Sequence, residues 1–410
     1  MFAKIEDIDW DWIENNRDCD TIKLRLNAHK GERSMTDFAI LQIECRRKAA
    51  KKLPITLKHK KFLFPTALSA EQCTSDRLAA YHSSLVPLGA KILDMTSGLG
   101  IDVFHFASRA DKITAIDINP DIAKILQQNS QTLGINNITA VNADSCDFIQ
   151  GTSNHYDVIF IDPARRGNNG RRLFALSDCE PNVTAILPSI KAKCDKLIVK
   201  ASPMLDITQT LRELPNATDI YVIGTVQECK ELVIVSDFKS DSKCINIHAV
   251  TLTNAQEIDL SYNILSEENA SVRYNSPQVE EYIYEPYPAV MKAAPFKYLS
   301  QKYEVDKLHV NTHLYTSKKR VIDFPGDIFK IECIIPFSSK EIKHFAKQYP
   351  QINIAVRNFF MSADELRKKL KVKDGGDKKA IGCTTTDGSK IILIASRVHK
   401  HDIISQTFAP

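Results

Sequence analysis

Between residues 91 and 162 the chain carries four short runs of mainly apolar residues, each with a polar or acidic residue at or just after its end. The runs are Ile92–Leu93, Ile113–Ile118, Ile138–Asn142 and Asp157–Ile161. Strands that are buried on both faces have this pattern, and the segments between the runs carry apolar residues at helical spacing. The alternation predicts an α/β fold in which helices cover a parallel, Rossmann-like sheet.

The pattern changes on either side of this alternation. Residues 1–63 have apolar positions at helical spacing, among them Phe38, Leu41 and Cys45, and predict an N-terminal helical domain. After residue 162 the apolar runs predict strands at 196–200, 219–224, 231–237 and 244–252, with a helix at 205–214. No helix fits between 224 and 231, so a hairpin is expected there. The polar segment 253–275 is expected to be a domain boundary, and the rest of the chain, with a strand expected at 308–315, predicts one or two small α+β domains.

A glycine-containing loop, Asp94-Met-Thr-Ser-Gly-Leu-Gly100, lies between the first strand and the first helix of the alternation. Glycine has no Cβ, so the backbone can approach a ligand closely and adopt positive φ. A strand, a glycine loop and a helix N-terminus form a nucleotide-type site. The third glycine of a dinucleotide fingerprint is replaced by Val103, and Asp94 suits the ammonium of a methionine moiety better than a diphosphate. The loop therefore favours S-adenosylmethionine (SAM) over NAD.

Three more acidic residues follow the next three strands. Asp117 lies about 20 residues after Asp94, where a carboxylate can accept hydrogen bonds from both ribose hydroxyls. Asp144 is placed to accept a hydrogen bond from the adenine amino group, and Asp162 follows the fourth strand. One acid at a strand end is commonly a solvated residue, but four in register after four parallel strands favour a cofactor site.

These residues resemble the motifs of class I SAM-dependent methyltransferases. The match covers residues 64–252, with the glycine loop, Asp117, Asp144 and Asp162-Pro163 at the motif positions. The chain is similar in particular to the THUMP-like RNA methyltransferases of Bacteroidota, whose catalytic domain is followed by a ferredoxin-like and a THUMP-like domain. With the helical N-terminus, the resemblance implies a helical domain at 1–63, a methyltransferase domain at 64–255, a ferredoxin-like domain at 276–335 and a THUMP-like domain at 336–410.

The resemblance also implies a set of cofactor contacts. In class I methyltransferases, residues just before the glycine loop often lie over the methionine end of SAM, which makes Gln72 and Thr74 candidates. Ser75 or Asp76, in the same segment, is equally suited to cap a helix. The expected cofactor-binding residues are Gln72, Thr74, Asp94, Thr96, Gly98, Gly100, Asp117, Ile118, Asp144, Ser145 and Asp162.

The acceptor of the methyl group is indicated less directly. Asp162-Pro163 lies where the fourth motif of the family faces the methyl group, but enzymes that methylate base amines commonly have a second proline and an aromatic residue next, and this chain has Ala164-Arg165. The same string resembles the uridine C5 methyltransferases. Those enzymes need a cysteine nucleophile after the fifth strand, where this chain has Lys200-Ala-Ser-Pro203, so a covalent adduct is disfavoured.

A third alternative resembles the ribose 2′-O-methyltransferases, in which a lysine takes the hydroxyl proton. Asp162, Lys200 and Glu231 lie in compatible places and are the candidate catalytic residues. Lys200 is equally suited to be a strand-end lysine that pairs with Asp162 and buries its stem. Arg165 and Arg166 are expected to bind substrate phosphate or to pair with acids. Both a base nitrogen and a ribose hydroxyl remain open as acceptors.

The net charge of +4 is small but unevenly distributed. Residues 46–61 hold eight lysines and arginines and no acid, and two shorter basic runs lie at 318–320 and 367–373. Basic runs are commonly solvated faces. Three of them around a methyltransferase domain favour a polyanionic substrate, because phosphate contacts supply affinity that does not depend on sequence. Structured RNA, either tRNA or rRNA, is the expected partner.

Composition removes several other classes of protein. No apolar run approaches the ~18 residues of a membrane span, and the first residues lack the apolar segment of a signal peptide. The ten cysteines form no C-x-x-C pair, so neither a metal site nor a disulfide framework is expected, and the cytoplasm is the expected location. The alternatives are a non-catalytic RNA-binding protein on a methyltransferase scaffold and a methyltransferase of small molecules or proteins. The intact acids argue against the first and the basic runs against the second, and the sequence does not indicate an oligomeric state.

Overall fold

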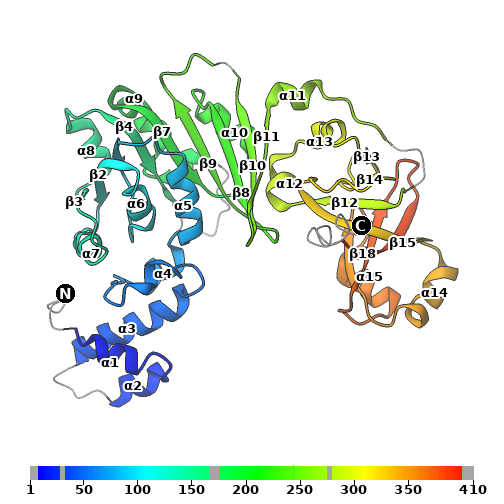
Figure 1. Ribbon diagram of the computed structural model, residues 1–410, viewed down its shortest axis with the longest axis horizontal. Coiled ribbons are helices and arrows are strands. Elements are labelled where there is room, and N and C mark those ends of the chain that lie inside the picture. The colour runs from blue at the N-terminus through cyan, green and yellow to red at the C-terminus, as the bar shows by residue number, and fades with distance from the viewer. Residues whose placement is uncertain (1–7, 28–32, 166–174, 243, 275–278, 399–410) are drawn as a thin grey trace, which may run out of the picture. The chain divides into compact units, whose positions relative to one another are not determined.

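The structure is a computed structural model that describes residues 8–27, 33–165, 175–242, 244–274 and 279–398 (Figure 1). The chain forms two compact units. Unit 1 comprises residues 1–217 and 234–241, and unit 2 comprises residues 218–233 and 242–410.

Unit 1 begins with the expected helices, α1 (Trp10–Asn15), α2 (Thr21–Asn27) and α3 (Arg33–Ala49), which are followed by a 3₁₀ turn (Thr56–Lys58). Two buried amide side chains hold the segment after them. Gln42 of α3 exchanges hydrogen bonds with the backbone of Phe64, and Asn129 of α7 (Pro120–Thr132) does the same with Leu63. A helix that the sequence did not predict, α4 (Ala67–Gln72), follows, and the Thr66 hydroxyl caps it by accepting from the Ser69 amide.

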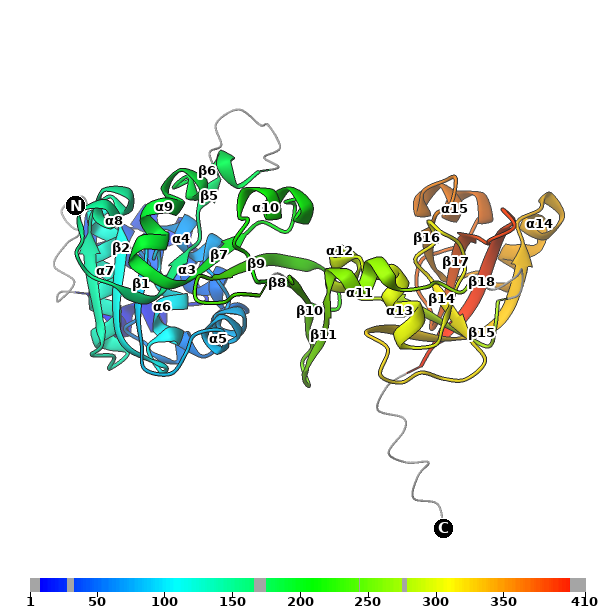
Figure 2. The same cartoon turned by 90° about the horizontal axis from the view of Figure 1, so that it is seen from above.

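The expected parallel strands form the centre of unit 1. They are β1 (Ala90–Asp94), β2 (Ala110–Asp117), β3 (Ile138–Asn142), β4 (Tyr156–Ile161) and β7 (Cys194–Ala201), hydrogen-bonded in the order β7-β4-β1-β2-β3. Helices α5 (Asp76–Ser84) and α6 (Ile101–Phe106) lie on one side of this sheet, and α9 (Val183–Lys193) and α10 (Ile207–Glu213) lie on the other (Figure 2). The α/β fold class predicted from the sequence is confirmed.

Beyond β7 the sheet continues with four more strands, in the order β9 (Cys229–Asp237), β8 (Asp219–Gly224), β10 (Asn246–Leu252) and β11 (Glu257–Asn263). The residues of β9 are divided between the two units. The segment 253–275 was expected to be only a polar boundary, but it holds β11 and α11 (Ile264–Asn269). In β11, Leu260 and Tyr262 are buried and alternate with exposed polar residues. A strand that is covered on one face alternates buried and exposed residues with a period of two. Counting the polar residues of the segment does not show this alternation.

Unit 2 contains a second sheet of seven strands in the order β13-β14-β12-β15-β18-β17-β16. The elements are β12 (Tyr282–Pro286), α12 (Pro288–Ala293), α13 (Phe296–Lys302), β13 (Asp306–Lys307), β14 (Tyr315–Ser317), β15 (Gly326–Pro336), α14 (Ser339–Gln348), β16 (Asn353–Arg357), α15 (Ala363–Leu370), β17 (Lys378–Thr384) and β18 (Lys390–Arg397). The strand expected at 308–315 is wrong for most of its length. Leu308 and Leu314 are buried in a hydrophobic cluster although they lie outside strands, so their apolar character comes from packing and not from a strand.

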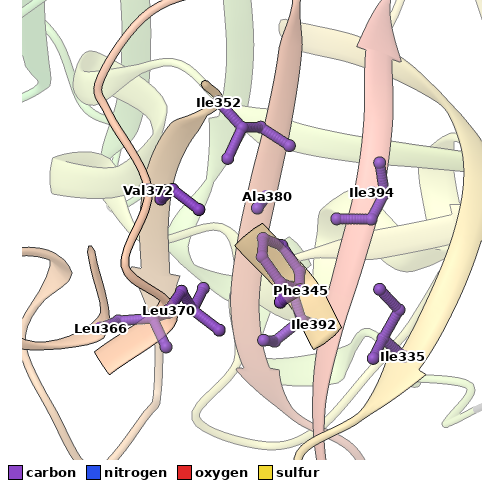
Figure 3. Close-up of a cluster of buried hydrophobic side chains, with 9 residues drawn as sticks. All are labelled: Ile335, Phe345, Ile352, Leu366, Leu370, Val372, Ala380, Ile392 and Ile394. Atoms are coloured by element: carbon purple, nitrogen blue, oxygen red, sulfur yellow. The ribbon is translucent and has the colours of Figure 1, made fainter. Parts of the chain in front are cut away.

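Helices α14 and α15 cover one face of the sheet at strands β17 and β18. Figure 3 shows Phe345 of α14 and Leu366 and Leu370 of α15 gathered against Ile392 and other apolar residues of the strands. The apolar face of each helix therefore packs against the core, and the opposite face carries polar residues.

Candidate functional site

The glycine loop has the backbone that its sequence predicts. Gly98 and Gly100 have φ of +50° and +85°, in the left-handed region that favours glycine. A Cβ on Gly100 would also lie 2.9 Å from the ring of Phe104. At the start of the loop, the Thr96 amide donates to Oδ1 of Asp94 at 2.8 Å. The loop therefore turns tightly around the end of β1 and leads directly into α6.

Asp94 is almost fully buried, with 1% of its surface exposed. Burial raises the pKa of Asp94 to about 8, because the loss of hydration outweighs the hydrogen bond from the Thr96 amide, which lowers the pKa, and the nearby charge of Asp102 adds a smaller increase. A cation beside Asp94 would favour its ionised form. The ammonium of a methionine moiety is such a cation.

Asp117 connects the end of β2 to the glycine loop. Its Oδ2 accepts from the Gly98 amide at 3.1 Å, and its Oδ1 accepts from the Asn119 amide at 2.8 Å. A carboxylate oxygen has two acceptor positions, so each oxygen can accept one more hydrogen bond, as a pair of ribose hydroxyls would require. Burial raises the pKa of Asp117. The next residue, Ile118, is 71% exposed and offers an apolar surface beside the carboxylate.

Asp144 caps the helix that follows β3, α8 (Ser145–Gly151). Its Oδ1 accepts from the amides of Cys146 and Asp147 at 2.7 and 3.2 Å. This capping role was not predicted, because an acid at this position fits both a helix cap and an adenine contact. Contacts of Asp144 and Ser145 with a cofactor stay predictions.

Asp162 follows β4 and is connected to the glycine loop, since its amide donates to the Thr96 hydroxyl at 2.7 Å. Its Oδ2 accepts from Nζ of Lys200, near the end of β7, at 2.5 Å. The side chain of Asp162 is 40% exposed and that of Lys200 is 12% exposed. The structure therefore brings together two of the three candidate catalytic residues as an ion pair whose carboxylate reaches the surface.

A buried polar cluster that was not predicted from the sequence includes Lys200 of this ion pair. Asp102, in the first turn of α6, accepts from the Thr74 hydroxyl at 2.5 Å and lies 2.7 Å from Nδ1 of His82. Nζ of Lys200 donates to the Thr74 hydroxyl at 2.9 Å and lies 4.0 Å from Asp102. Burial alone would raise the pKa of Asp102, but the charges of His82 and Lys200 outweigh burial and hold the pKa well below its usual value.

A sequence signal for this cluster did exist. Asp102 stands among Ile101, Val103 and Phe104 on a helix that opens against the sheet, and an acid in such surroundings needs a partner. The partners, His82 and Lys200, lie far from it along the chain, so only the fold identifies them.

The remaining predicted residues are placed separately. Gln72 is exposed at the end of α4, and Glu231 is buried in β9 with 5% of its surface exposed. The backbone of Arg165 lies in the two-residue strand β5 (Ala164–Arg165), which pairs with β6 (Cys179–Glu180). Arg166 lies outside the described residues. The roles predicted for these four residues stay predictions.

Within the described ranges, no group of three or more histidine, cysteine or acidic residues is arranged to hold a metal ion. No described helix is both long and apolar enough to cross a membrane.

The chain matches three protein families. Residues 49–173 match Conserved hypothetical protein 95, residues 282–325 match a ferredoxin-like domain, and residues 326–397 match a THUMP domain-like family. A crystal structure named "putative methyltransferase from Porphyromonas gingivalis W83" is 30% identical and has a TM-score of 0.88, and the alignment covers 97% of this chain and 100% of that one.

Over shorter stretches the chain is similar to curated RNA methyltransferases and to other SAM-dependent methyltransferases. A 23S rRNA (uracil(747)-C(5))-methyltransferase of Vibrio cholerae is 26% identical over 28% of this chain and 30% of its own length. An uncharacterized SAM-dependent methyltransferase of Mycobacterium tuberculosis is 28% identical over 35% of this chain and 37% of its own length. The chain thus spans only about a third of the length of these curated relatives.

Proposed function

Because the chain belongs to the family of the Porphyromonas gingivalis protein, class I SAM-dependent methyltransferases that carry ferredoxin-like and THUMP-like domains, we propose that it transfers a methyl group from SAM to structured RNA. SAM supplies an electrophilic methyl group when it is bound. The residues of this chain have to hold the cofactor, exclude water and position the acceptor, since an in-line displacement depends mainly on positioning.

One observation carries the cofactor assignment. Asp94, the glycine loop and Asp117 lie at the carboxyl ends of the adjacent parallel strands β1 and β2, where α/β sheets bind nucleotides. The buried Asp94 would bind the ammonium of SAM, and this cation would favour the negatively charged form of the Asp94 carboxyl. Asp117 would accept from the ribose hydroxyls while the Gly98 amide keeps it in place, and Ile118 would contact the adenine.

The RNA assignment is supported by α14 and α15, which lie in the THUMP domain-like part of the chain. The outer face of α14 presents Lys340, Lys343, His344 and Lys347, spaced i, i+3, i+4 and i+7. The lysines at and after the end of α15 are Lys368, Lys369, Lys371 and Lys373. Since α14 and α15 contact each other, these exposed lysines lie on neighbouring elements, and both sets are suited to contacts with a phosphate backbone.

An exposed aromatic residue belongs to the same region. Phe360, between β16 and α15, is 60% exposed and lies 4.9 Å from Phe359 and 5.4 Å from Phe337, measured between ring centroids. Nζ of Lys369 lies 5.2 Å from the centroid of the Phe337 ring. Unpaired RNA bases stack on aromatic rings beside basic residues, so this surface favours RNA over a small-molecule acceptor. A tRNA or rRNA substrate places the protein in the cytoplasm, in agreement with its ten free cysteines.

The test is a methylation assay with labelled SAM and with total tRNA and rRNA from a strain that lacks the gene, followed by nucleoside analysis. Transfer of label to one RNA class supports the proposal. SAM binding without transfer to any RNA refutes the RNA part, and the absence of SAM binding supports the non-catalytic alternative.

A further inference from the structure

We propose that Lys200 is a positioning residue for Asp162, held as an ammonium ion by the buried Asp102–His82 pair, and that the acceptor is therefore a nitrogen of an RNA base and not a ribose hydroxyl. The inference rests on the proposed function and names the acceptor class of the same site. It decides between the two acceptors that the sequence leaves open.

The first argument is the charge around Lys200. Its Nζ lies 2.5 Å from Asp162 and 4.0 Å from Asp102, so two carboxylates face one amine whose side chain is only 12% exposed. Removing the positive charge would take the cation away from Asp162 and leave His82 alone to balance the buried Asp102, which is unfavourable in a poorly solvated place. A lysine that accepts a hydroxyl proton must first be neutral, and this environment opposes that state.

The second argument is the direction of the hydrogen bonds. The side chain of His82 is fully buried, and because an ionised carboxylate only accepts, Nδ1 of His82 donates to Asp102. The Thr74 hydroxyl donates to the other oxygen of Asp102, so the Thr74 oxygen accepts from Lys200. The cluster thus orders Lys200 as a donor towards both Thr74 and Asp162. A lysine acting as a base would need a lone pair where the cluster places N–H bonds.

The third argument is what this arrangement does for Asp162. Lys200 binds Oδ2 of Asp162, and the Thr96 hydroxyl accepts from the Asp162 amide. The carboxylate is thereby kept ionised and fixed at the exposed end of the cluster. There it can accept a hydrogen bond from an N–H group of a nucleobase. In the transfer, the acceptor nitrogen forms a bond to the methyl carbon while the bond from that carbon to the cofactor sulfur breaks. The sulfur keeps the electron pair, and the proton that the nitrogen loses passes to Asp162.

Two pairs of variants test the positioning role. Lys200→Met should lower kcat on the order of 10²-fold or more, whereas Lys200→Arg keeps a cation that cannot act as a base and should retain kcat within about tenfold. His82→Phe removes the donor to Asp102, and His82→Asn keeps a donor near the position of Nδ1. We expect the asparagine variant to recover most of the kcat lost in the phenylalanine variant. The SAM dissociation constant, measured by calorimetry, should stay unchanged in all four variants, which separates positioning from loss of the cofactor site or the fold.

The product identifies the acceptor. Nucleoside analysis should show the methyl group on a base nitrogen. A methyl group on ribose O2′ overturns the proposal whatever the variants do. So does a result in which neither Lys200→Arg nor His82→Asn exceeds its partner variant in turnover. If the wild-type protein binds SAM but methylates no RNA, the proposed function itself fails, and this outcome is distinguishable because it appears before any variant is compared.

Discussion

Asp117→Ala tests the cofactor site most directly, and the structure gives its magnitude. The carboxylate already accepts one backbone amide on each oxygen, from Gly98 and Asn119, which leaves one acceptor position on each oxygen for the two ribose hydroxyls. A hydrogen bond to a charged group contributes about 1.5–3 kcal/mol. At the low end of this range, losing both should weaken SAM binding by about 3 kcal/mol, or on the order of 100-fold, with about tenfold as the lower bound if the two bonds are strongly coupled.

Isothermal titration calorimetry of SAM with four proteins, the wild type and three variants, measures this effect. Asp117→Asn keeps the shape and one acceptor oxygen, so its affinity should lie between those of the wild type and Asp117→Ala. The exposed Asp111 lies near the opposite end of the same strand, and Asp111→Ala is the matched control with unchanged affinity expected. Thermal unfolding has to show that the Asp117→Ala protein is folded, because the Gly98 amide loses its partner. A folded Asp117→Ala protein that binds SAM as tightly as the wild type would refute the assignment.

Other predictions concern stability and RNA binding. Asp76 is buried and accepts from two backbone amides and the Thr56 hydroxyl, so Asp76→Ala should lower the free energy of unfolding by about 2–4 kcal/mol in urea denaturation, and an effect below about 1 kcal/mol would contradict the contacts. Burial alone would lower the pKa of His248, but hydrogen bonds with Asp219 and a second acid raise it to about 9. The contribution of His248 to stability is therefore complete below about pH 6.5 and is lost as pH rises through about 9. The difference in unfolding free energy between the wild type and His248→Gln should shrink over that range. A difference that stays constant with pH would argue against the ion pair. Reversing the lysines of α14 and α15 to glutamate should weaken RNA binding and flatten its salt dependence without changing SAM affinity. Phe360→Ala should weaken binding of single-stranded RNA by about fivefold or more, because a stacked base contributes about 1–3 kcal/mol, and equal affinity in a filter-binding assay would exclude stacking there.

The parallel strands of unit 1 could be predicted well because burial on both faces leaves few polar residues in them. Ile92 and Leu93, for example, are fully buried, and a short apolar run between regular helical segments is typical of a buried parallel strand. The position of Asp117 could be predicted equally well, since it lies at the end of a recognisable strand. The edge strand β11 was missed because only alternate residues, such as Leu260, are buried.

The basic surface of α14 was missed for a related reason. Its lysines are separated in sequence by core residues such as Phe345, so no run of basic letters marks them. The run at 367–373 was visible because the end of the helix and the residues after it are contiguous. Function that is spread over one face of an amphipathic helix is visible only when the helical period is applied to polar residues as well as apolar ones.

Asp94 and Asp162 lie at the ends of neighbouring strands of one sheet, yet their surroundings give them different chemistry. Burial raises the pKa of Asp94 to about 8, so at neutral pH a cation beside Asp94 shifts it towards the carboxylate form. Asp162 already has a cation, Lys200, at 2.5 Å, so its carboxylate has a partner before any ligand arrives. The first acid is thus suited to recognise a charged ligand and the second to accept a proton from a neutral one. A cationic cofactor and a neutral base nitrogen are the pair of ligands that this difference fits, and the division depends on Asp102 and His82 keeping the lysine on the side of Asp162.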